Sequence, residues 1–144
     1  MPDVHALLGA SSAERWMQCP PSAMLTADMP DPGSPFAAEG TLAHAAGELK
    51  LREHFLSPLG VKRFAKALQK LKGDTADDTW KEILHCTDEY LDAVIEIATA
   101  FPSAPYVAVE QRVAFDEWVP EGFGTADCVM VCGDVLHIVD YKHG

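Results

Sequence analysis

The 144-residue chain carries 22 acidic and 11 basic residues, so its formal net charge at pH 7 is -11. This balance argues against strong nonspecific affinity for nucleic acid. Hydrophobic residues make up 48% and charged residues 23% of the chain, as expected for one globular domain over residues 1–144. The sequence lacks a membrane span and a signal peptide, so we expect no membrane partner. Its four cysteines show no disulfide-framework spacing, which predicts a reduced, cytoplasmic protein.

The charge is distributed unevenly along the chain. Residues 50–72 hold seven lysines and arginines against Glu53 alone, whereas residues 73–100 hold Lys81 against eight acidic residues. The basic block is consistent either with a phosphate-binding surface or with an ordinary solvated face. Its candidates for phosphate contact are Lys62, Arg63, Lys66 and Lys70.

Two helical segments are predicted in the first third of the chain. Residues 11–14 (SSAE) have the pattern of a capping box and predict a short helix that Pro20-Pro21 ends. Residues 26–35 have the composition of a loop. Ser34 and Pro35 then form an N-cap and N1 pair, which predicts a helix to about residue 56.

Two glycines interrupt the second of these helices. Gly40 and Gly47 each cost up to about 1 kcal/mol relative to alanine in a helix. We therefore expect another backbone or a ligand to come close to them.

Two further helices and three strands are predicted after the break at Ser57-Pro58. A basic helix runs to about Leu71, and a long helix runs from about Asp77 to Phe101 with apolar residues at spacings of three and four. Strands are predicted at 106–115, 125–132 and 135–142, where valine and isoleucine are frequent. Helices followed by strands predict an α+β fold with the helices packed on one sheet.

The last two strands flank Gly133-Asp134, which predicts a two-residue type II′ hairpin turn. In such a hairpin the numbers of opposed residues sum to 267, so Asp127 faces Asp140, and Lys142 projects from the same face. Cys128 and Cys132 alternate onto the other face, where we expect small core residues.

Two opposed carboxylates repel each other, and this repulsion requires a compensating charge. A hard divalent cation, Mg²⁺ or Mn²⁺, is one explanation, because such ions bind carboxylate oxygens. A structural ion triad, in which Lys142 neutralises Asp127 and Asp140, is the other. At this level His44, taken alone, is an ordinary half-exposed histidine.

Four elements resemble the RecB-like branch of the PD-(D/E)XK nuclease superfamily. They are the serine-rich start that ends in Cys19-Pro20, the helix motif G-x-x-x-H at Gly40 and His44, GTAD at 124–127, and IVDYK at 138–142. Together they resemble a phage- or prophage-encoded subfamily labelled as a domain of unknown function. The resemblance implies a mixed sheet with a restriction-endonuclease-like core, and cleavage of DNA with Mg²⁺ or Mn²⁺.

The resemblance also implies a site. His44, Asp127, Asp140 and the backbone carbonyl of Tyr141 would ligate the metal, and Lys142 would act on the attacking water or the scissile phosphate. A histidine ligand tends to favour Mn²⁺. Glu110 is kept only as a candidate outside the ligands, because no register can be derived for its strand.

Some members of this branch hold an iron–sulfur cluster, and Cys19 matches the position of its first ligand. We expect no cluster in this chain, because Cys128 and Cys132 would lie about 13 Å apart along a strand and the other ligands of the family come after Gly144. The family's next strand and its glutamine helix also come later, so the resemblance implies a C-terminally incomplete domain with little turnover. DNA is the implied partner, together with other phage replication or recombination proteins. The alternative is a non-catalytic phage protein that keeps the fold for DNA or protein binding.

Overall fold

The protein is described from a computed structural model, which covers residues 6–29 and 33–144. The chain divides into two compact units. Of the described residues, the smaller unit contains 6–29 and 111–126, and the larger unit contains 33–110 and 127–144. Within the described ranges, no helix is long and apolar enough to cross a membrane.

The helices of the smaller unit differ in detail from the prediction. A 3-10 turn, η1 (Ala10–Ser12), leads into α1 (Ala13–Gln18), and a separate helix α2 (Pro21–Thr26) follows. The predicted capping box is wrong, because no side chain caps α1 and the Ser12 hydroxyl instead donates to the Gly9 carbonyl at 3.2 Å. Pro21 does not only end a helix but also begins one, since proline fits the first helical position. Part of the predicted loop, residues 30–32, lies outside the described residues.

The helices of the larger unit follow the prediction closely. α3 (Pro35–Leu51) begins at Ser34, whose Oγ accepts a hydrogen bond from the Ala37 N–H at 3.0 Å, and it continues into a π-helical turn, η2 (Arg52–Leu56). After the break come α4 (Val61–Lys72) and α5 (Asp77–Thr99). The predicted N-cap and the break are therefore confirmed.

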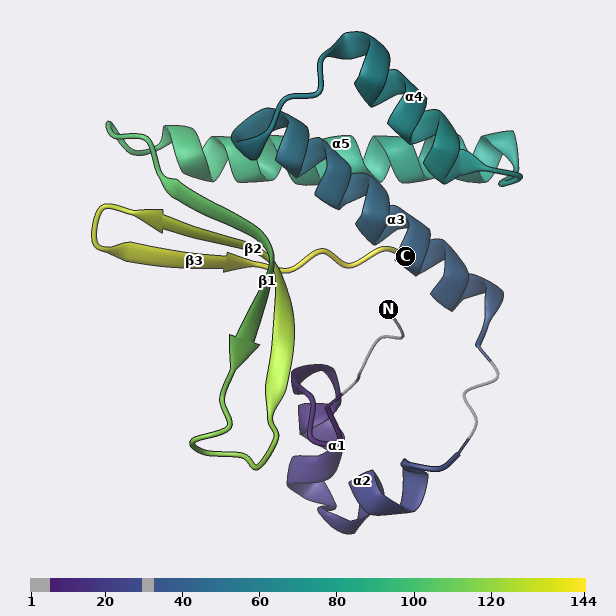
Figure 1. Ribbon diagram of the computed structural model, residues 1–144, viewed down its shortest axis with the longest axis vertical. Helices are drawn as coiled ribbons and strands as arrows, with labels where there is room; N and C mark the ends of the chain where they lie inside the picture. The colour runs from purple at the N-terminus through teal and green to yellow at the C-terminus, as the bar shows by residue number, and fades with distance from the viewer. Residues whose placement is uncertain (1–5, 30–32) are drawn as a thin grey trace. The chain divides into compact units, whose positions relative to one another are not determined.

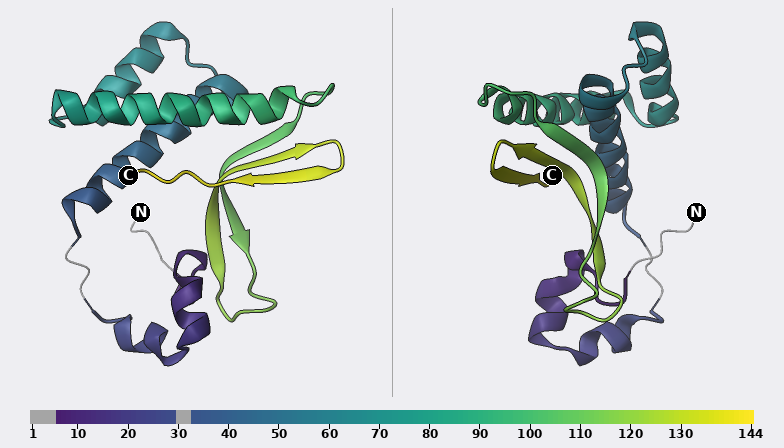
Figure 2. Two further views of the ribbon diagram at one scale, coloured as in Figure 1. Left: turned by 180° about the vertical axis from the view of Figure 1, so that it is seen from behind. Right: turned by 60° about the vertical axis from the view of Figure 1, so that its left-hand side comes forward.

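The core of the larger unit lies along one face of α5. Figures 1 and 2 show α3 crossing α5, with the β2–β3 hairpin beside α5. The buried side chains of α5 recur at spacings of three and four, as expected for an amphipathic helix. They are Trp80, Ile83, Thr87, Tyr90, Val94 and Ala98. Ala43, Ala46 and Leu51 of α3 pack into the same core.

The sheet has the order β1 (Tyr106–Ala114), β2 (Phe123–Cys132) and β3 (Val135–Val139), and its strands are antiparallel. The pairing of β2 with β3 runs from Cys132 opposite Val135 to Cys128 opposite Val139. The sum of 267 is thus confirmed, and Gly133 has the positive φ, +64°, of the first position of a type II′ turn. These elements confirm the α+β fold.

Strand β3 is shorter than predicted, because it ends at Val139 and not at Lys142. Beyond Val139 the chain leaves the ladder and runs toward α3 (Figure 1). The Tyr141 N–H donates to the Asp127 carboxylate at 2.7 Å. A side chain therefore takes the hydrogen bond that a continued strand would give to a backbone carbonyl.

The two faces of the hairpin have opposite surroundings. Cys128, Met130 and Cys132 are fully buried, which confirms that the two cysteines are core residues. On the other face Leu136 and Ile138 are 61% and 65% exposed. The face of the hairpin on which Asp127 and Asp140 were predicted is therefore more exposed to solvent than its apolar residues indicate.

Candidate metal centre

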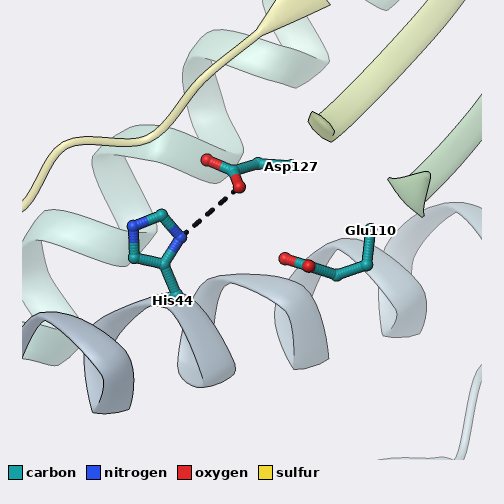
Figure 3. Close-up of side chains that lie close together, drawn as sticks. All are labelled: His44, Glu110 and Asp127. Atoms are coloured by element: carbon teal, nitrogen blue, oxygen red, sulfur yellow. Dashed lines mark ion pairs between the residues drawn. The ribbon is translucent and has the colours of Figure 1, made fainter. Parts of the chain in front are cut away.

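Three side chains from separate elements converge in the larger unit. His44 comes from α3, Glu110 from β1 and Asp127 from β2, and Figure 3 shows all three directed toward one another. One potential ligand atom of each lies within 4.8 Å of the others, and all three residues are partly buried. A histidine nitrogen with two carboxylates suits Mn²⁺ or Mg²⁺. The donor set therefore fits the predicted cation.

Helix α3 positions His44. Its Nδ1 lies 3.5 Å from Oδ1 of Asp127. At Gly40, one turn earlier, a Cβ would meet nothing within 4 Å, whereas at Gly47 it would lie 3.3 Å from the Tyr90 ring. At Gly47 the close approach is thus made by a side chain, whereas at Gly40 no protein atom of the described residues makes one, and approach by a ligand stays a prediction.

Glu110 reaches the site through an unusual backbone conformation. Its φ of +52° is left-handed, which is rare for a residue with a Cβ and is found at sites where strain serves function. Next to it the Val109 carbonyl accepts a hydrogen bond from Arg52 Nη2 at 3.4 Å, and Arg52 Nε donates to Glu48 Oε1 at 2.6 Å. Arg52, at the C-terminal end of α3, thereby links this helix to β1 at the residue before Glu110.

The electrostatics of Glu110 follow from this placement. Burial and then the charges of Asp127 and Glu48 raise the pKa of the Glu110 carboxyl, while His44 and Arg52 oppose the shift. Burial and neighbouring carboxylates both disfavour the charged form of a carboxyl, and the positive charge near Glu110 does not fully offset them. A bound cation would supply further positive charge.

Asp127 is held by the C-terminal segment. Its Oδ2 accepts the Tyr141 N–H, and its Oδ1 faces His44. The Tyr141 ring packs edge-on against His44, with centroids 5.3 Å apart. The Tyr141 hydroxyl lies 3.0 Å from His143 Nδ1, and His143 Nε2 lies 3.1 Å from Glu39 Oε1. These contacts tie residues 141–143 to α3 and orient the Asp127 carboxylate.

Asp140 and Lys142 are not among the three converging residues, and they pair with each other. Lys142 Nζ lies 2.7 Å from Asp140 Oδ2, and the two side chains are 82% and 55% exposed. The hydrogen bond to Asp140 is the main reason why the pKa of Lys142 is raised. This pair corresponds to part of the predicted ion triad. Ligation by Asp140 and by the Tyr141 carbonyl stays a prediction.

The basic block divides into two parts in the structure. Lys62, Arg63, Lys66 and Lys70 are exposed on α4, and none of them makes an ion pair with another residue that the structure describes. Lys50 is only 5% exposed, and its Nζ donates to the Leu84 carbonyl at 2.7 Å and to Asp88 at 2.5 Å. Lys50 is therefore a structural residue, and DNA contact by the α4 residues stays a prediction.

Sequence reasoning missed three residues around the site. Glu110 was not expected among the ligands, and Glu48 and Tyr90, which line the same pocket, were not considered. Glu48 lies four residues after His44, so helical spacing alone places it on the same face. Tyr90 continues the buried face of α5. The position of Glu110 depends on its left-handed backbone, for which the sequence carries no signal.

Comparison with known proteins gives a family for the chain. No solved structure matches it. A family model described as "Protein of unknown function (DUF2800)" matches residues 5–144. Since this match spans nearly the whole sequence, the chain belongs to the DUF2800 family.

Proposed function

We propose that the protein is a divalent-metal-dependent DNA nuclease of the RecB-like PD-(D/E)XK type, with a restriction-endonuclease-like core and a role in phage DNA processing. The observation that carries the proposal is the proximity of His44 and Asp127, 3.5 Å apart on α3 and β2. The G-x-x-x-H and GTAD motifs nominate these two residues independently. Glu110 adds a second carboxylate at the same point.

The proposed residues have separate roles. His44, Glu110 and Asp127 hold Mn²⁺ or Mg²⁺, and Asp140 joins them through the family pattern. When bound, the cation supplies Lewis-acid polarisation of the phosphodiester. Lys142 orients the attacking water or contacts the scissile phosphate. Its raised pKa keeps the ammonium charged, and the charge stabilises the negative charge that develops during hydrolysis.

The substrate side of the proposal rests on α4. Its four exposed cations, Lys62, Arg63, Lys66 and Lys70, present positive charge on a protein that is otherwise acidic. Such a local patch binds phosphates through counterion release despite an unfavourable net charge. We assign DNA contact to this helix.

A second function is favoured by one observation. Leu136 and Ile138 are exposed on the same face of the hairpin as Val131, which is 39% exposed. Neighbouring exposed apolar side chains are typical of protein-binding surfaces. A non-catalytic phage protein that keeps the fold for protein or DNA binding is therefore the alternative.

The test is DNA cleavage as a function of Mg²⁺ and Mn²⁺ concentration, with calorimetric metal binding measured on the same protein. Asp127→Ala removes a ligand, so we expect both metal affinity and cleavage to fall. Lys142→Ala removes no ligand, so metal should bind normally while cleavage is lost. His44→Ala should be intermediate and partly rescued by excess Mn²⁺.

The outcomes separate the two functions. Cleavage in EDTA, or wild-type cleavage by Lys142→Ala, would contradict the nuclease mechanism. Metal binding without cleavage by the wild-type protein would favour the non-catalytic alternative.

A further inference from the structure

The hydroxyl of Tyr90 lies beside the candidate metal centre and has no hydrogen-bond partner among the described residues; it is buried, with only 8% of the residue exposed. The nearby carboxylate of Glu110 is one of the three converging ligands. Both residues line the same small pocket as His44 and Asp127. A buried hydroxyl without a partner costs free energy, so its presence requires an explanation.

The position of the Tyr90 ring is set by close packing. At Gly47 of α3 an added Cβ would lie 3.3 Å from Tyr90 Cδ1, so glycine leaves room for the ring. The Tyr141 ring covers another side, with its centroid 4.9 Å from that of Tyr90. The ring is therefore packed on two sides, and its hydroxyl is buried.

The hydroxyl remains a hydrogen-bond donor at neutral pH. Burial is the largest cause that raises the pKa of Tyr90, and the negative charges of Asp127, Glu110 and Asp140 add to it. These contributions place the hydroxyl in a region of negative potential. An O–H group in such a region favours donation to a carboxylate oxygen.

We propose that Tyr90 is a positioning residue of the metal centre, whose hydroxyl donates a hydrogen bond to the Glu110 carboxylate when a cation binds. This inference rests on the metal centre of the proposed function. A carboxylate has about four lone-pair sites, so an oxygen that ligates an ion still accepts from a donor. Donors beside metal ligands orient those ligands, and their removal costs 10- to 100-fold in affinity in other proteins.

The test is Mn²⁺ affinity of the Tyr90→Phe protein, measured by calorimetry and compared with its thermal unfolding without metal. We expect about tenfold weaker Mn²⁺ binding. Without metal the variant should unfold at the same or a higher temperature, because phenylalanine removes an unpartnered buried hydroxyl. Tyr106→Phe is the matched control, since Tyr106 is 63% exposed, and it should change neither quantity.

A further comparison tests whether Tyr90 acts through Glu110. Glu110→Ala and the double variant Glu110→Ala/Tyr90→Phe should bind Mn²⁺ with the same weakened affinity. Electron paramagnetic resonance, which measures the concentration of free Mn²⁺, is used because it can quantify weak binding. A further tenfold loss in the double variant would overturn action through Glu110. Wild-type Mn²⁺ affinity in Tyr90→Phe would overturn the role of the hydroxyl and leave the metal centre standing. Failure of the wild-type protein to bind Mn²⁺ would overturn the metal centre itself.

Discussion

We expect Glu110 to strengthen metal binding and, at the same time, to destabilise the protein when no metal is bound. Its carboxylate is partly buried and lies close to Asp127, and burial followed by the charge of Asp127 raises its pKa. Replacing Glu110 by glutamine keeps the size of the side chain and removes the charge. We predict that Glu110→Gln stabilises the protein without metal and weakens its metal binding.

The magnitude follows from the geometry. Ligand atoms of Glu110 and Asp127 lie within 4.8 Å, where two unit charges repel by about 3 kcal/mol at an effective dielectric constant of about 20. His44 and Arg52 attract the Glu110 carboxylate and offset part of this repulsion. Because solvent also screens these partly exposed groups, we expect a net gain of about 1 kcal/mol, which raises the unfolding temperature by about 4 °C in a chain of this size.

The predicted gain depends on pH. The folded pKa of Glu110 is raised above its ordinary value of 4.5, so the folded state binds this proton more tightly than the unfolded state. The contribution of this group to stability is therefore full below pH 4.5 and is lost as the pH rises through the folded pKa. Glu110→Gln should match the wild-type protein at pH 4 and exceed it at pH 8.

The assay is thermal unfolding followed by circular dichroism at both pH values, with and without Mn²⁺. At a concentration of 100 times the dissociation constant, Mn²⁺ stabilises the wild-type protein by about 2.7 kcal/mol, which should reverse the order of the two proteins at pH 8. Glu82→Gln, on the exposed side of α5, is the matched control. A less stable Glu110→Gln protein at pH 8 without metal, or an unchanged Mn²⁺ shift in that variant, would refute the reasoning.

Two further predictions concern the lysines. Asp88→Ala should lower the free energy of unfolding in urea by about 1 to 3 kcal/mol, because it leaves the buried Lys50 ammonium without its carboxylate. Lys50→Met should lower the free energy of unfolding by less, and equal decreases for the two variants would contradict this explanation. Charge reversal at Lys66 and Lys70 should weaken DNA binding and flatten its dependence on salt, as measured by fluorescence anisotropy, whereas unchanged affinity and slope would show that α4 is only a solvated face.

Local sequence signals predicted most of the secondary structure. Ser34-Pro35 defines the start of α3, the break at Ser57 separates it from α4, and Gly133-Asp134 sets the register of the hairpin. Each of these depends on the chemistry of a few adjacent residues, such as a capping hydroxyl or a glycine with positive φ. Such signals do not depend on what packs around them, so the sequence alone determines them.

The failures have a common cause. Ser12 is a residue type that often caps helices, but its hydroxyl donates to the Gly9 carbonyl. The predicted last strand ends three residues early, where the Tyr141 N–H donates to the Asp127 carboxylate. In both places a competing hydrogen-bond partner decides the outcome. The presence of such a partner is not visible in the pattern of the segment itself.

In the candidate site, too, some residues were predictable from the sequence and one was not. His44 and Asp127 were identified from the sequence, because each lies in a short motif and on an element whose type the local pattern predicts. The third ligand was decided by the tertiary structure, since the left-handed backbone at Glu110 accompanies the approach of its carboxylate to His44 and Asp127. Which side chains meet across elements depends on backbone strain and on contacts between distant segments, and these exist only in the folded chain.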